Sequence, residues 1–105
     1  MASMTEVPPI VDNESMNRFE VTVDGHRAEL VYERDADFLV LVHTGVPDEL
    51  EGRGVGGALV AAAVDDAVRR DLTVVPECEF ARGWLERHPE VADRARIEWS
   101  DRSAP

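Results

Sequence analysis

The chain contains no lysine and only one cysteine, Cys78, in 105 residues. A single cysteine cannot form an internal disulfide, so we expect a thiol at Cys78 and a reducing, cytoplasmic setting. The 22 acidic residues outnumber the 11 arginines, which leaves a formal net charge of −11. This balance argues against non-specific nucleic-acid binding, which needs a basic face, and against attraction to anionic lipid.

Long hydrophobic runs are also missing. No segment approaches the roughly 20 apolar residues that span a bilayer, and no charged-then-apolar leader opens the sequence. We therefore expect neither a membrane span nor a secretory signal. The length suits one domain, which we place at residues 17–99. Met1–Met16 carries two prolines and no periodicity, and it predicts a mobile tail, as does the polar segment Ser100–Pro105.

The first half of the domain has the patterns of β-strands. Phe19, Val21 and Val23 alternate with polar residues, which predicts a half-buried strand. Asp24-Gly25 is a hairpin signal, and we expect 26–34 to be the return strand. The apolar run 38–42 is typical of a central strand covered on both faces. The sequence therefore predicts a three-stranded antiparallel meander.

The second half reads as helix, strand, helix. Apolar residues at helical spacing predict a helix over 54–70, and its polar face carries the i,i+4 pairs Asp65 with Arg69 and Asp66 with Arg70. A short strand follows at 72–75 and a second helix at 79–87, while 90–99 leaves open a helical turn and a brief strand at 97–99. We expect Phe80 and Trp84 of the second helix to lie in the core, with a role as a cofactor wall as the alternative. For His88, near its C-terminus, we expect capping chemistry.

Four glycines lie within six residues, between the third strand and the first helix: Gly52, Gly54, Gly56 and Gly57. Glycine lets a backbone approach a ligand closely, and the amides that open a helix lack intrahelical partners. Such a turn suits a phosphate-bearing cofactor. The alternative is a tight strand-to-helix turn without a ligand.

Two other glycine motifs fit poorly. Gly52, Gly54 and Gly57 match the dinucleotide pattern G-x-G-x-x-G, and Glu77 lies at the position of its ribose acid. However, the preceding strands form a meander rather than a βαβ unit, and five residues separate strand from motif. A Walker-type P-loop is excluded because Ala58-Leu59 replaces the lysine and hydroxyl pair.

The order of meander, glycine turn, helix, strand and helix resembles the acyl-CoA N-acyltransferase fold of the Gcn5-related superfamily, an α/β (α+β) class with a mixed, mostly antiparallel sheet. Segment 51–56 occupies the cofactor motif R/Q-x-x-G-x-G/A, with Glu51 replacing the usual Arg or Gln and Arg53 available to compensate. The segments HTGVPDELEGRGVGGALV and VVPECEFARGWLERHPE narrow the resemblance, over residues 19–90, to minimal single-domain acetyltransferases related to YjdJ-like proteins.

The resemblance implies an acetyl-CoA site. Gly45 and Val46 would pair with the pantetheine arm, residues 53–57 would hold the pyrophosphate, and the acetyl group would lie where the third strand and the strand at 72–75 splay apart. The implied cofactor-binding residues are Gly45, Val46, Glu51, Gly52, Arg53, Gly54, Val55, Gly56 and Gly57.

Cys78 and His43 are the candidate catalytic residues. Either Cys78 accepts the acetyl group with His43 as its base, or His43 deprotonates the acceptor amine directly while Cys78 lines the site. The non-catalytic alternatives are a structural role for His43 and a buried, unreactive thiol at Cys78. Tyr32, in the second strand, is not expected to reach the site as a general acid. A metal site is not expected, because His26, His43, Cys78 and His88 show no ligand-pair spacing.

The expected function is acetyl transfer to an amine. The acidic charge favours a cationic acceptor, such as a basic peptide or protein. The superfamily's N-terminal helices have no counterpart here, so we expect an open site that serves a large acceptor as a monomer or is completed in a homodimer. The alternative is a non-catalytic CoA-binding or protein-interaction domain.

Overall fold

The alternation in the first half of the chain forms the expected meander. The computed structural model describes residues 7–99. In it, β2 (Arg18–Val23) pairs antiparallel with β3 (His26–Arg34), which pairs antiparallel with β4 (Phe38–Gly45). The hairpin turn has φ values of 51° at Asp24 and 80° at Gly25. Two consecutive positive φ angles match the twist of the flanking strands, which explains the Asp-Gly pair.

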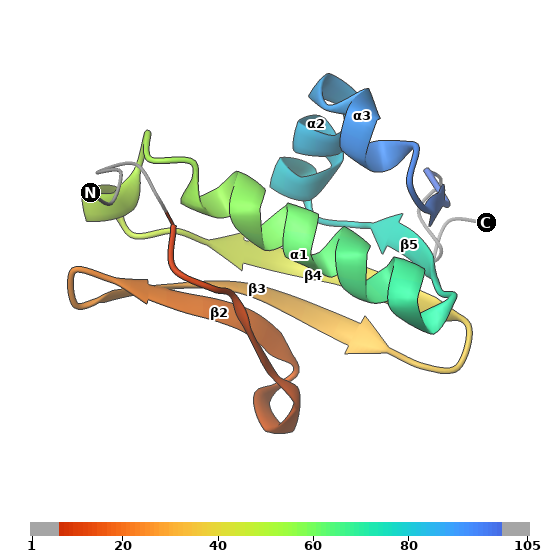
Figure 1. Cartoon of the computed structure of the whole chain (residues 1–105), viewed down its shortest axis with the longest axis horizontal. Coiled ribbons are helices and arrows are strands. Elements are labelled where there is room, and N and C mark those ends of the chain that lie inside the picture. Colours follow the sequence, from red (N-terminus) through yellow and green to blue (C-terminus); the bar gives the residue numbers. More distant parts are fainter. Residues whose placement is uncertain (1–6, 100–105) are drawn as a thin grey trace.

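The second half adds parallel strands to this meander. Helix α1 (Val55–Arg70) leads to β5 (Thr73–Pro76), and α2 (Glu79–Arg87) and α3 (Pro89–Ala92) lead to β6 (Arg96–Ile97). Strands β4, β5 and β6 are parallel, and the sheet order is β1-β2-β3-β4-β5-β6. Each of these parallel strands lies next to the one before it, so right-handed connections place all the connecting helices on the same face of the sheet. Figure 1 shows α2 and α3 beside α1. The predicted mixed, mostly antiparallel α/β (α+β) fold is confirmed.

The N-terminal segment differs from the sequence prediction. Residues Val11–Asn13 form β1, which pairs antiparallel with β2, and Glu14–Met16 form a 3-10 helix, η1. Val7 and Ile10 pack against the core. The prediction of a mobile tail is therefore wrong for 11–16, because an edge strand of three residues needs no internal periodicity. Residues 1–6 and the predicted tail 100–105 lie outside the described part of the chain.

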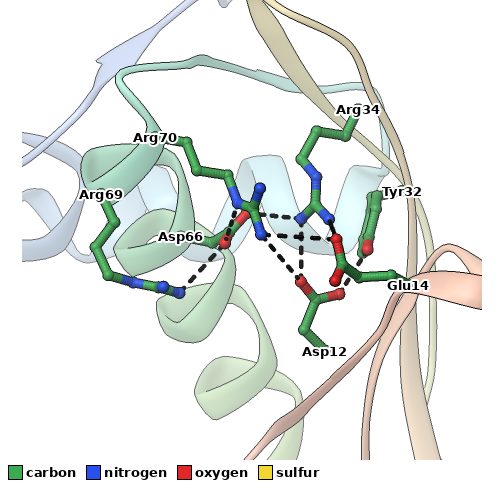
Figure 2. Close-up of polar contacts among 7 residues, drawn as sticks. All are labelled: Asp12, Glu14, Tyr32, Arg34, Asp66, Arg69 and Arg70. Atoms are coloured by element: carbon green, nitrogen blue, oxygen red, sulfur yellow. Dashed lines mark hydrogen bonds and ion pairs between the residues drawn. The ribbon is translucent and has the colours of Figure 1, made fainter.

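A polar network joins this edge to the helix (Figure 2). The carboxylate of Asp66 in α1 is fully buried and accepts hydrogen bonds from Arg34 at 2.9 Å, Arg70 at 2.8 Å and Arg69 at 3.2 Å. Burying a carboxylate requires such compensation. The predicted Asp66–Arg70 pair is confirmed. The predicted partner of Arg69 is wrong, because Arg69 bonds Asp66 while Asp65 pairs with Arg94 at 2.5 Å.

The same network holds the N-terminal strand. Arg34 also contacts Asp12 at 3.1 Å and Glu14 at 2.6 Å, and the Tyr32 hydroxyl donates to Asp12. Burial and the hydrogen bond to Asp12 raise the pKa of Tyr32 above its ordinary value. Tyr32 is thus buried on the core side of the meander, where its hydroxyl bonds Asp12. It does not line the cavity described below, in agreement with the expectation that it does not reach the site.

Candidate functional site

The sheet opens where β5 ends. Strands β4 and β5 pair through Leu41 and Pro76, and β4 then continues to Gly45 beside β3 alone. Among the described residues, no strand pairs with the other edge of 42–45. The amide of Cys78 donates to the carbonyl oxygen of Leu41 at 2.9 Å, which closes the inner end of the opening. The predicted opening between these strands is therefore present, because β5 ends while β4 continues.

A register shift lies next to this opening. Tyr32 of β3 pairs with Leu41, but Val31 pairs with His43, so β4 contains one extra residue, Val42. The glycine at the end of this strand, Gly45, is compatible with a bulge or with a close backbone approach, and the bulge lies three residues before it. The extra residue reverses the alternation of side chains after Leu41. Thr44, opposite the buried Leu30, therefore lies on the helix-covered face, and His43 lies on the other face.

The glycine turn leads into an uncapped helix. After the 3-10 helix η2 (Asp48–Leu50), Gly52 has φ 79° and Gly54, the N-cap of α1, has φ 77°. No side chain caps this helix, and the amide of Ala58, which donates to the Gly54 carbonyl at 3.0 Å, begins the helical ladder. The amides of 55–57 precede this ladder and are available as donors.

The other two glycines have a different role. A Cβ at Gly56 would lie 2.6 Å from Cζ of Phe80, and a Cβ at Gly57 would lie 2.4 Å from Nε1 of Trp84. These positions are glycine because the rings of α2 pack directly on the first turn of α1. At Gly52 and Gly54 a Cβ would meet nothing within 4 Å, so positive φ explains glycine there. The glycines thus serve the turn and the helix packing.

A cavity of about 340 Å³ lies in front of this helix N-terminus. It is lined by Thr44, Val46, Leu50, Glu51, Gly52, Gly54, Val55, Gly56, Gly57, Phe80 and Trp84. It contains all the predicted cofactor-binding residues except Gly45 and Arg53. The guanidinium of Arg53 instead pairs with Asp24 at 2.9 Å, in the β2–β3 turn, so it does not offset the charge of Glu51.

Four of these lining residues were not predicted as binding residues. Leu50 is buried and Thr44 follows the bulge, so neither carries a sequence signal of its own. Phe80 and Trp84 were expected in the core, with a cofactor wall as the alternative. Trp84 is half-buried and packs against the core, whereas Phe80 is 41% exposed, and both rings line the cavity. Ala81 and Leu85 supply the buried stripe of α2 instead. His88 stacks on Trp84, and its Nδ1 lies 2.8 Å from the Trp84 carbonyl oxygen, in the capping role expected for it.

The two candidate catalytic side chains lie apart. Cys78 is the N-cap of α2 and is 9% exposed, and its Sγ lies 3.3 Å from Oγ1 of Thr44, which lines the cavity. His43 is exposed on the opposite face of β4. The idea that His43 acts as the base for Cys78 therefore has no contact to support it, because the bulge turns the imidazole away.

The arrangement defines an acyltransferase-type fold, with a glycine turn, a splayed strand pair and a cavity between them. Residues 18–94 match the family described as GCN5-related N-acetyl-transferase. Among relatives, the chain is 35% identical to mouse Protein NATD1 over 86 residues, covering 78% of each chain. It is 36% identical to human Protein NATD1 over 75 residues, covering 69% of this chain and 66% of the relative.

A solved structure agrees with these relatives. A GCN5-like protein from Staphylococcus aureus, determined by NMR, superposes with a TM-score of 0.65 and 32% identity, covering 91% of this chain and 96% of that one. The chain belongs to the GCN5-related N-acetyltransferase family, as the resemblance predicted. Within residues 7–99, no helix is long and apolar enough to span a bilayer. In the same range no three metal-binding side chains converge.

Proposed function

We propose that this protein is an acetyl-CoA-dependent N-acetyltransferase. The observation that carries the proposal is the uncapped N-terminus of α1, which faces a cavity next to the unpaired edge of β4. Amides that lack partners at a helix N-terminus suit a phosphate group. An unpaired strand edge suits an extended chain with amide groups, such as the pantetheine arm.

The residues present fit CoA with one unfavourable element. The amides of Val55, Gly56 and Gly57 would hold the pyrophosphate, and the β4 edge near Gly45 and Val46 would hold the pantetheine. The rings of Phe80 and Trp84 form an apolar wall. Glu51 lines the same cavity as a carboxylate, which repels phosphate. The backbone donors therefore have to outweigh one opposing charge.

Acetyl-CoA supplies a thioester whose carbonyl carbon accepts a nucleophile. The acceptor nitrogen forms a C–N bond while the C–S bond breaks, and one of its protons passes to the departing sulfur, so that CoA leaves as the thiol. A cationic acceptor first gives one further proton to a base. The opposite placement of His43 and Cys78 favours direct transfer, in which His43 takes that proton from an acceptor on the far side of β4. Cys78, behind Thr44, would then line the inner end of the cavity.

The proposed acceptor is a cationic amine, including a lysine of a basic peptide or protein. A net charge of −11 favours positive ligands. The sheet face that carries His43 has no covering helix among residues 7–99, which leaves room for a large acceptor or for a second copy in a homodimer. The proposed location is the cytoplasm, where acetyl-CoA is available and Cys78 remains reduced.

A non-catalytic CoA-binding domain is the second candidate. Glu51 weakens the phosphate motif, and Tyr32, the only tyrosine, is buried and bonded to Asp12 rather than available as an acid for the leaving thiolate. Both candidates bind CoA, so binding does not distinguish them.

Two experiments test the proposal. In an amide NMR titration with CoA, we expect the largest shifts at 55–57; an unchanged spectrum would reject both candidates. CoA release from acetyl-CoA, measured with a thiol reagent across amines and basic peptides, separates them, because the binding domain gives no turnover. His43→Gln should lower kcat, whereas Cys78→Ala should lower it only if the thiol carries the acetyl group. Intact mass would then show an acetyl adduct on the wild-type protein.

A further inference from the structure

A second cavity lies on the opposite face of the end of β4. It has a volume of about 390 Å³ and is lined by Arg27, Glu29, Gly45, Val46 and Pro47. Val46 lines both this cavity and the one at the helix N-terminus. The two cavities therefore meet at the end of one strand, and the second one lies on the face that carries His43.

Gly45, which lines this cavity, lies next to two functional groups. A Cβ on Gly45 would lie 3.4 Å from Nε2 of His43 and 3.9 Å from Oε2 of Glu29. The imidazole of His43 and the carboxylate of Glu29 therefore both lie close to Gly45, on the side where another residue would carry its side chain. On Glu29, Oε1 faces Arg18 at 3.4 Å, and no described residue forms a hydrogen bond or ion pair with Oε2.

The surrounding charges restrict what this cavity accepts. Arg18 divides its contacts between Glu20 at 2.7 Å and Glu29 at 3.4 Å. Hydrogen bonds from Arg18 and Asn13 lower the pKa of Glu20, with a smaller contribution from the charge of Arg27. Arg27 lines the cavity as a cation. One ammonium on Glu29 is therefore favoured, while a second positive charge near Arg27 is not.

We propose that Glu29, beside His43, binds the ammonium of the acceptor, and that the acceptor is a lysine side chain of a peptide. The role of this site in holding the acceptor rests on the proposed function. Val46 and Pro47 offer an apolar wall for the lysine methylenes. Oε2 of Glu29 accepts a hydrogen bond from the ammonium, and Nε2 of His43 lies on the same side to receive a proton.

The test is a titration of the full chain, without CoA, followed through the ring resonances of His43. The probe is Nα-acetyl-lysine methylamide, and the matched neutral probe is Nα-acetyl-norleucine methylamide. We expect the lysine probe to shift His43 and the norleucine probe to leave it unchanged. Glu29→Gln should weaken lysine binding by about tenfold, since a charged hydrogen bond is lost. Arg27→Gln should strengthen it by roughly threefold.

Glu33→Gln is the control, because Glu33 is a carboxylate on the same strand that does not line the cavity. It should leave binding within about twofold. Equal binding of both probes, or an unaltered affinity in Glu29→Gln, overturns the ammonium site. Acetyl transfer is measured separately: binding without turnover rejects the proposed function and leaves the site standing. If Glu29→Gln turns over the lysine acceptor with the same KM as the wild-type protein, the ammonium site is rejected and the proposed function still stands.

Discussion

Gly57→Ala tests whether Gly56 and Gly57 are glycine because the rings of α2 pack against them. In an open helix, Ala is more stable than Gly by about 0.5–1 kcal/mol. Here the new Cβ would lie 2.4 Å from Nε1 and 2.9 Å from Cε2 of Trp84, against an ordinary separation of about 3.5–4.0 Å. The indole must move by roughly 1 Å, and overpacking of this kind costs about 1–3 kcal/mol. We expect a net loss of about 0.5–2 kcal/mol in the free energy of unfolding.

The assay is urea unfolding followed by far-UV circular dichroism, in a double-mutant cycle with Trp84→Ala. Once the indole is removed, Gly57→Ala should become stabilising by about 0.5 kcal/mol or more. Gly83→Ala is the matched control: its Cβ meets only the flexible end of Arg87, at 3.2 Å, so it should not destabilise. The packing explanation is refuted if Gly57→Ala is neutral, or if its cost persists when Trp84 is absent.

Three further changes have expected outcomes. Asp66→Asn removes the buried negative charge that Arg34, Arg69 and Arg70 share and replaces one acceptor oxygen by an NH2 group, so it should lower the free energy of unfolding by about 2–4 kcal/mol in urea. Asp65→Asn, in a half-exposed pair with Arg94, should cost under about 1 kcal/mol, and equal effects would contradict the buried network. Because the pKa of Tyr32 is raised in the folded state, its contribution to stability is complete below pH of about 10 and is lost above it; alkaline thermal melts of Tyr32→Phe should lose that step, and an identical pH profile would reject it. Glu51→Gln should tighten CoA binding about 3–10-fold in calorimetry at low salt, and unchanged affinity would place the phosphates elsewhere.

The candidate site has its two halves on the two faces of one strand. The cavity at α1 is lined by Thr44, whose Oγ1 contacts Sγ of Cys78. His43 and Glu29 lie on the other face of the sheet, away from α1. A single extra residue, Val42, produces this separation. In the proposed reaction, the acyl donor and the acceptor amine would therefore approach from opposite faces and meet beside β4, where β5 has ended.

Local patterns in the sequence determined most of the elements. Alternation predicted β2 and β3, Asp24-Gly25 predicted their turn, and the bounds predicted for α2 agree with the structure. The glycine turn was predictable because positive φ at Gly52 and Gly54 is a local requirement. The resemblance, carried by contiguous motifs, pointed to residues of this turn, and most of them line the cavity. That they bind a cofactor stays a prediction.

The tertiary structure decided which residues meet. Simple alternation along β4 would put His43 on the same face as Leu39 and Leu41. The pairing with β3 contains a bulge at Val42, which turns His43 to the other face. The burial of Asp66 depends on Arg34, which is 32 residues away in the chain, and β1 exists only because β2 offers an edge. The sequence contains the residue types and their local periods, but contacts between distant segments depend on register and packing, which no single segment encodes.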